Sequence, residues 1–118
     1  MEKEKNNIKI LEQIEEFNCY VKNLNYLIIP QGLFKKDMDG IKLKIIALLN
    51  MYETSIFYLS DKDFSEMFNI DIEKIKKTLT ELEKENLISI DFIELGITKI
   101  RYIKKTIKFY EYLGGYYE

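Results

Sequence analysis

Lysines recur on one side of a segment with helical periodicity, Ile72 to Lys84. With Ile75 at the centre of the apolar stripe and about 100° per residue, Lys77, Thr80 and Lys84 face outward, and Lys74 and Lys76 flank them. Ammonium groups in such positions bind phosphates or guanine edges, and a threonine can contact a phosphate or a thymine methyl. The chemistry that this segment offers is nucleic-acid binding through one helix face.

Two carboxylates interrupt that face. Glu81 could accept a hydrogen bond from a cytosine amino group. Glu73 precedes Lys77 by four residues, the favourable order for an ordinary surface ion pair. Both roles stay open from the sequence.

A second group of cations follows in the chain, between Leu95 and Phe109, where no acidic residue occurs. Its members are Lys99, Arg101, Lys104, Lys105 and Lys108. Because the formal net charge of the chain is −2, this excess is local, and it predicts contact with a nucleic-acid backbone dominated by this segment. The alternative is a solvated strand edge whose lysines oppose aggregation. The predicted DNA-binding residues are Lys74, Lys76, Lys77, Thr80, Lys84, Lys99, Arg101, Lys104 and Lys105.

The sequence contains no motif that indicates an enzyme. The chain has no histidine for acid–base work, no Gly-rich phosphate loop, and no cysteine or carboxylate cluster with metal spacing. Asp61 and Asp63 are explained by helix capping, and Cys19 has no nameable partner base. We therefore expect no enzyme activity, no cofactor, no metal site and no small-molecule substrate.

The composition is that of one globular domain. The 118 residues are 47% hydrophobic and 32% charged. A single cysteine rules out a disulfide framework and favours a reduced compartment. The opening MEKEKNN leads into an amphipathic segment rather than a signal core, and no apolar run approaches the roughly 20 residues of a membrane helix. We expect a cytoplasmic protein without membrane contact.

The elements that must position the cations can be read in chain order. A helix is predicted from Lys5 to about Leu24, and its apolar stripe packs either on the core or on a second copy. Tyr26 to Pro30 is predicted as a short β-rich run, residues 31–40 as a loop, Ile41 to Tyr52 as a helix and Ile56 to Leu59 as a strand.

The next two helices are joined by only three residues. Ser60 and Asp63 have capping-box spacing at the start of the first helix, Asn69 suits the left-handed turn that ends it, and Asp71 caps the second. So short a joint fixes the angle between the two helices.

A hairpin is predicted directly afterwards. Ile88, Ile90 and Phe92 share one face of the first strand, and Leu95-Gly96 is the predicted turn. On the second strand Ile100 and Tyr102 share one face, and Lys99, Arg101 and Ile103 share the other. The last residues, 106–118, could extend the strand, form a short helix or fray.

At this point the pattern resembles a known family. DFSEMFNIDIEKIKKTLTELEKENLISI is similar to the winged helix-turn-helix family, whose pattern V…L..LE..GLI precedes the wing; Asn86 stands at its glycine. Upstream, Ile29-Pro30 and Leu48-Leu49 resemble the amino-terminal domains of plasmid replication initiators and DnaD-type primosome proteins. The resemblance covers about Tyr26 to Lys105.

The resemblance implies an α+β fold, a small helical bundle with a two- to three-stranded antiparallel hairpin wing and an extra amino-terminal helix. The expected division is an amino-terminal helix (1–25), a winged-helix core (26–105) and an aromatic tail (106–118). The implied function is binding of double-stranded DNA in plasmid or phage replication, partition, conjugative transfer or transcription regulation. We expect the DNA to be AT-rich and the protein to be a homodimer, because one recognition helix reads few base pairs. The alternative is a winged-helix protein–protein interaction module. The tyrosine-rich tail could also stack on single-stranded bases, although core packing explains it better.

Overall fold

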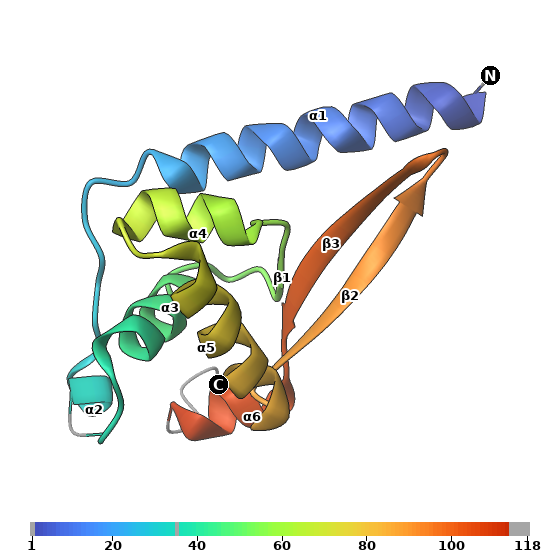
Figure 1. The fold of residues 1–118 in the computed structure, drawn as a ribbon. Coiled ribbons are helices and arrows are strands. Elements are labelled where there is room, and N and C mark those ends of the chain that lie inside the picture. Colours follow the sequence, from blue (N-terminus) through green and yellow to red (C-terminus); the bar gives the residue numbers. More distant parts are fainter. Residues whose placement is uncertain (1, 35, 114–118) are drawn as a thin grey trace.

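The computed structural model describes residues 2–34 and 36–113, which form an α+β fold of six helices and one small sheet (Figure 1). The helices are α1 (Glu2–Lys22), α2 (Gln31–Phe34), α3 (Gly40–Asn50), α4 (Asp61–Phe68), α5 (Ile72–Lys84) and α6 (Ile107–Tyr112). The strands are β1 (Ile56–Phe57), β2 (Ile88–Leu95) and β3 (Thr98–Lys105), all antiparallel in the order β1-β3-β2.

The core lies where α3, α4 and α5 meet the base of the hairpin. Its largest fully buried side chains include Phe57, Phe64 and Phe109, one each from β1, α4 and α6. The apolar stripe of α5 faces this core, with Ile75, Leu79 and Leu82 buried. Ile72, which helical periodicity places on the same stripe, is 36% exposed at the first turn. Burial of this stripe leaves the opposite face of α5 to solvent.

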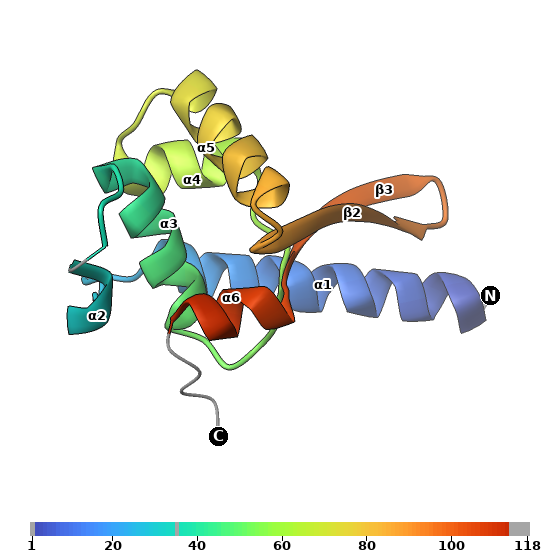
Figure 2. The same ribbon diagram turned by 90° about the horizontal axis from the view of Figure 1, so that it is seen from below.

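Helix α1 crosses α4 and continues beside the hairpin, so the molecule is elongated, with extents of 52 × 33 × 27 Å (Figures 1 and 2). It begins three residues earlier and ends two residues earlier than predicted. Lys22 at its carboxyl end pairs with Asp63 of α4 at 3.1 Å. Burial tends to raise the pKa of Asp63, but the Ser60 backbone N–H and Lys22 outweigh it, so that this pKa is lowered. This contact fixes α1 over α4.

The predicted β-rich run at residues 26–30 is wrong. These residues have no regular secondary structure and pair with none of the strands β1, β3 and β2. Exposure alternates as in a strand, with Tyr26 and Ile28 exposed and Leu27 and Ile29 half-buried against the core. The loop predicted after Pro30 contains one short helix, α2.

The tight joint between α4 and α5 is confirmed. Ser60 and Asp63 form the reciprocal capping box, with hydrogen bonds of 2.9 and 3.1 Å. Asn69 is left-handed, with φ 54°, and Asp71 accepts a 2.8 Å hydrogen bond from the Glu73 backbone N–H. Asn86 also has positive φ, at 63°, and ends α5 just before β2.

The hairpin is confirmed with a turn one residue later than predicted. Leu95 pairs with Thr98, so Gly96 and Ile97 form the turn, and Gly96 has the φ of +67° that favours glycine there. Beyond β3, Thr106 caps α6, the helical alternative among those left open for the tail. Tyr116 and Tyr117 lie outside the described residues.

No helix within 2–34 and 36–113 combines the length and apolar character needed to cross a membrane.

Candidate nucleic-acid interface

Helix α5 presents its predicted cationic face to solvent. Asp71 caps its first turn and the apolar stripe holds the opposite side in the core. The predicted side chains on the open face are all exposed: Lys74, Lys76, Lys77, Thr80 and Lys84. The structure therefore brings the five helix residues together on one surface.

The charges on this face pair differently from the prediction. Glu73 contacts Lys76 at 3.7 Å, one residue short of the predicted partner Lys77, and both side chains are more than half exposed. Such a pair contributes little stability. Among the described residues Lys74, Lys77 and Lys84 have no ion-pair partner, so three ammonium groups are open for an anion. The Thr80 hydroxyl donates to the Lys76 carbonyl at 2.9 Å, which leaves its methyl group and an oxygen lone pair for contacts.

The hairpin cations are divided between the inside and the outside of the molecule. Arg101 donates to the Asp61 carboxylate at 2.7 Å and to the Leu59 carbonyl at 2.9 Å. Lys105 is 3% exposed, and its ammonium donates to the Leu49 and Tyr52 carbonyls at 3.0 and 2.8 Å. Both side chains were predicted as DNA-binding residues on an open wing, and both are instead occupied by contacts within the chain.

The hairpin register explains this placement. Ile88 lies opposite Lys105, Ile90 opposite Ile103, and Phe92 opposite Arg101, and directly opposed residues share a face of the sheet. Arg101 and Lys105 therefore share a face with the residues that enter the core. The sequence carried this signal, because the alternation that puts Ile88 and Ile90 inward extends across the turn to the odd-numbered residues of the return strand.

The remaining hairpin cations, Lys99 and Lys104, are exposed but lie on opposite faces. Lys99 shares the face of Phe92 and lies over its ring at 4.7 Å. Lys104 shares the face of Tyr102, whose ring contacts Tyr58 at 6.2 Å. Lys99 and Lys104 thus form no single patch.

That second hairpin face is turned toward α1. The Tyr58 carbonyl accepts a 3.2 Å hydrogen bond from Asn18 of α1, and the Asn7 side chain lies 3.6 Å from where a Cβ on Gly96 would stand. Leu95 is buried there, away from the main core. Figures 1 and 2 show the hairpin tip beside the amino-terminal half of α1. The face that carries Lys99 and Phe92 is consequently the one turned away from α1.

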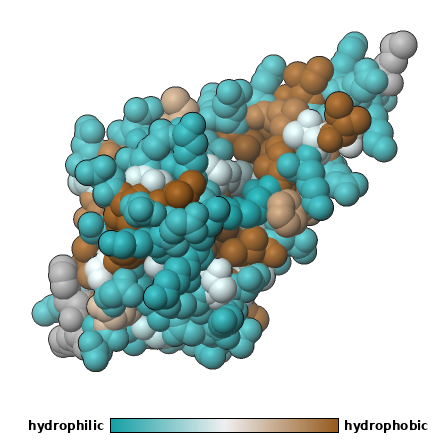
Figure 3. Space-filling view, viewed as in Figure 1, coloured by the Kyte–Doolittle hydropathy of each residue, from teal (hydrophilic) through white to brown (hydrophobic). Residues whose placement is uncertain are grey.

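The surface near the hairpin tip is more hydrophobic than the surface over α5. In Figure 3, hydrophobic side chains gather at the upper right, where the hairpin tip lies beside α1, and mostly hydrophilic side chains cover the region of α5. On the hairpin, Phe92 in the middle of β2 is 50% exposed, and Ile97 in the turn is fully exposed. The candidate interface is therefore the open face of α5.

The carboxylates and the cysteine that could take part in catalysis or metal binding have other structural environments. Asp63 is held in its cap and ion pair, and Asp61 is held by Arg101. Cys19, in α1, is an exposed free thiol. Within the described part of the chain, no group of three or more histidine, cysteine or carboxylate side chains is placed to hold a metal ion.

Comparison with family models, with curated proteins and with solved structures gave no significant match.

Proposed function

We propose that the chain is a winged-helix protein that binds double-stranded DNA, with α5 in the major groove. The observation that carries the proposal is the open α5 face, where Lys74, Lys77 and Lys84 stand without ion-pair partners among the described residues. A helix about 10–12 Å across fits a B-DNA major groove. The order α4, three-residue joint, α5 and hairpin supports the same docking mode.

In this proposal the hairpin has a smaller part than the sequence suggested. Lys99 reaches the DNA backbone beside α5, because it lies on the hairpin face turned away from α1. Arg101 and Lys105 hold the hairpin on the body of the protein instead. Affinity then rests on a few phosphate contacts, and we propose that a homodimer doubles them, since one recognition helix reads few base pairs. A role in plasmid or phage replication, partition, conjugative transfer or transcription regulation follows from the resemblance, and the preference for AT-rich duplexes is part of the same proposal.

The test compares two double variants that lose the same charge. Lys74→Ala/Lys77→Ala removes two cations from the α5 face, and Lys5→Ala/Lys9→Ala removes two exposed cations from α1. Fluorescence anisotropy with a pool of AT-rich duplexes measures both. We expect the α5 variant to lose at least tenfold in affinity and the α1 variant less than threefold. Equal losses would contradict docking through α5.

The second candidate is a protein-docking module with the same fold, and it is favoured by two exposed hairpin residues, Phe92 in the middle of β2 and Ile97 in the turn. Large apolar side chains on an open surface are typical of protein contacts. The variant Ile97→Ser, which leaves the contact between Phe92 and Lys99 intact, separates the candidates. DNA affinity would be unchanged under the first proposal, and binding of a protein partner would be lost under the second.

A further inference from the structure

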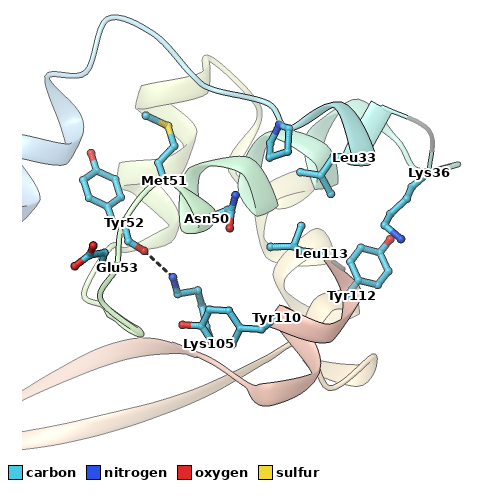
Figure 4. Close-up of a pocket in the computed structure, with 12 residues that line it drawn as sticks. Leu33, Lys36, Asn50, Met51, Tyr52, Glu53, Lys105, Tyr110, Tyr112 and Leu113 are labelled. Carbon is cyan, nitrogen blue, oxygen red and sulfur yellow. Dashed lines mark hydrogen bonds between the residues drawn. The ribbon is translucent and has the colours of Figure 1, made fainter. Parts of the chain in front are cut away.

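A cavity of about 860 Å³ lies between α2, the carboxyl end of α3 and α6, and the proposed DNA interface does not use it (Figure 4). Its apolar lining includes Leu33, Met51, Tyr110 and Leu113. Two lysines, Lys36 and Lys105, complete the wall. Cavities that bind small molecules commonly measure roughly 300–1,000 Å³ and combine an apolar lining with a few placed polar groups. The cavity has both properties.

Lys105 is buried in this wall. Its ammonium donates to the Leu49 and Tyr52 carbonyls, where the negative end of the α3 dipole lies. Three rings surround it, from Phe57 at 5.6 Å, Phe109 at 5.7 Å and Tyr110 at 5.3 Å. These contacts hold the nitrogen in a fixed place.

The positive charge of Lys105 is only partly compensated. No carboxylate among the described residues pairs with it, and its ammonium, which can donate three hydrogen bonds, donates two to them. Buried charges are normally paired, because an unpaired one loses its hydration without replacement. Burial accordingly lowers the pKa of Lys105 to about 8. An anion entering the cavity would supply the missing partner.

A second cation lies at the other edge of the same cavity. Lys36 stands 4.2 Å above the ring of Tyr112, and in Figure 4 the two are separated from Lys105 by the width of the cavity. Glu53 is the acidic residue of the lining. A ligand that carries an anionic group and an apolar body therefore matches the wall better than a neutral or cationic one.

We propose that this cavity is a binding site for a small organic anion, with its carboxylate on Lys105 and an aromatic or aliphatic body against Leu33, Tyr110 and Leu113. A carboxylate accepts the third ammonium proton and forms a charge-assisted hydrogen bond in a partly desolvated place. The body of the ligand replaces water on the apolar wall. This site is independent of DNA binding, and its test requires no DNA.

The first test uses a matched pair of probes, indole-3-acetate and the neutral indole-3-acetamide, titrated into the full chain and followed by ¹H–¹⁵N correlation spectra. We expect saturable shifts at the amides of Leu33, Met51, Tyr110 and Leu113, with the acetate at least tenfold tighter than the acetamide. Equal affinities, shifts centred on the hairpin tip, or no saturable shift at millimolar probe would each overturn the proposal.

Matched variants locate the anion. Lys105→Met removes the buried cation, and Lys104→Met removes the neighbouring exposed one. We expect the first to abolish the preference for the acetate and the second to leave it unchanged. Because Lys105→Met also removes hydrogen bonds to α3, Lys36→Met serves as a variant outside the core, with an expected loss of about threefold. Wild-type affinity in Lys36→Met together with an unchanged preference in a folded Lys105→Met would overturn the site.

The pH dependence gives a readout that needs no variant. Within the described part of the chain, the other titratable residues that line the cavity are Lys36, Glu53, Tyr52, Tyr110 and Tyr112. As Lys105 loses its proton above pH 8, affinity for indole-3-acetate should fall about tenfold between pH 7 and pH 9. Affinity for indole-3-acetamide should stay constant. Parallel profiles for the two probes would contradict an anion held by Lys105.

Discussion

The guanidinium of Arg101 and the carboxylate of Asp61 lie 2.7 Å apart across 40 residues of sequence, and they tie the middle of β3 to the first turn of α4. Both side chains are about one-fifth exposed, at 21% and 20%. The same guanidinium donates to the Leu59 carbonyl. These contacts hold the hairpin in one orientation relative to α4 and α5. The hairpin face that carries Lys99 therefore keeps its orientation relative to α5.

We predict that Arg101→Gln lowers the free energy of unfolding by about 1.5–3 kcal/mol, because it leaves Asp61 and the Leu59 carbonyl without a charged donor. Urea denaturation measures this change. Lys99→Gln, which removes an exposed cation from the same face of β3, should cost less than about 0.5 kcal/mol. If the two variants were equally stable, the ion pair would not anchor the hairpin.

Two substitutions of Asn69, in the joint between α4 and α5, should differ in their effect on stability. Its φ of 54° is left-handed, a conformation that glycine adopts freely and that costs alanine about 1 kcal/mol. Asn69→Gly should keep wild-type stability within about 0.5 kcal/mol, and Asn69→Ala should lose about 1 kcal/mol. Urea midpoints distinguish them. A glycine variant as unstable as the alanine variant would mean that another property of Asn69 is needed.

The elements with local chemical signals could be predicted from the sequence. Ser60, Asp63 and Asn69 interact with residues a few positions away, so their spacing is enough to place the ends of α4 and the start of the joint. The hairpin was likewise visible from its alternation. The extended run at residues 26–30 has the same local pattern as a strand, and only the absence of a neighbouring strand excludes it.

The sequence did not predict which side chains contact residues far away in the chain. Alternation shows that Arg101, Ile103 and Lys105 share a face, but the acceptors of both cations come from residues 40 to 56 positions away. Because this segment contains several basic residues and no acidic one, the sequence predicted that these cations lie on an exposed wing. For α5, in contrast, a single helix face contains all five predicted residues, so the periodicity placed them correctly.

The two exposed hairpin cations should differ in their effect on DNA. Lys99 lies on the face turned away from α1 and Lys104 on the opposite one, so that Lys99→Gln should weaken binding and lower the salt slope by about 1. Lys104→Gln should leave both unchanged. Anisotropy at three salt concentrations measures the slopes. A larger effect of Lys104 would show that the DNA lies on the α1 side.

The stability of the protein should rise with pH above 8. The pKa of Lys105 is about 8 in the folded chain and 10.5 in the unfolded one, so between these values the unfolded chain binds more protons. The free energy of unfolding should increase on the order of 2 kcal/mol from pH 7.5 to pH 9.5. Urea denaturation at both pH values, with Lys105→Met as the reference that lacks this increase, measures it. A fall in stability specific to the wild type would contradict the buried position of Lys105.

The central claim, that this chain binds duplex DNA through phosphate contacts from α5, is tested most directly by wild-type binding to a pool of AT-rich duplexes at two salt concentrations. Fluorescence anisotropy should show binding at low salt that falls steeply at high salt, because phosphate contacts release counterions. Sequencing of the retained duplexes would then identify the site. Absence of binding at low salt would contradict the claim and favour the protein-docking alternative at the hairpin tip.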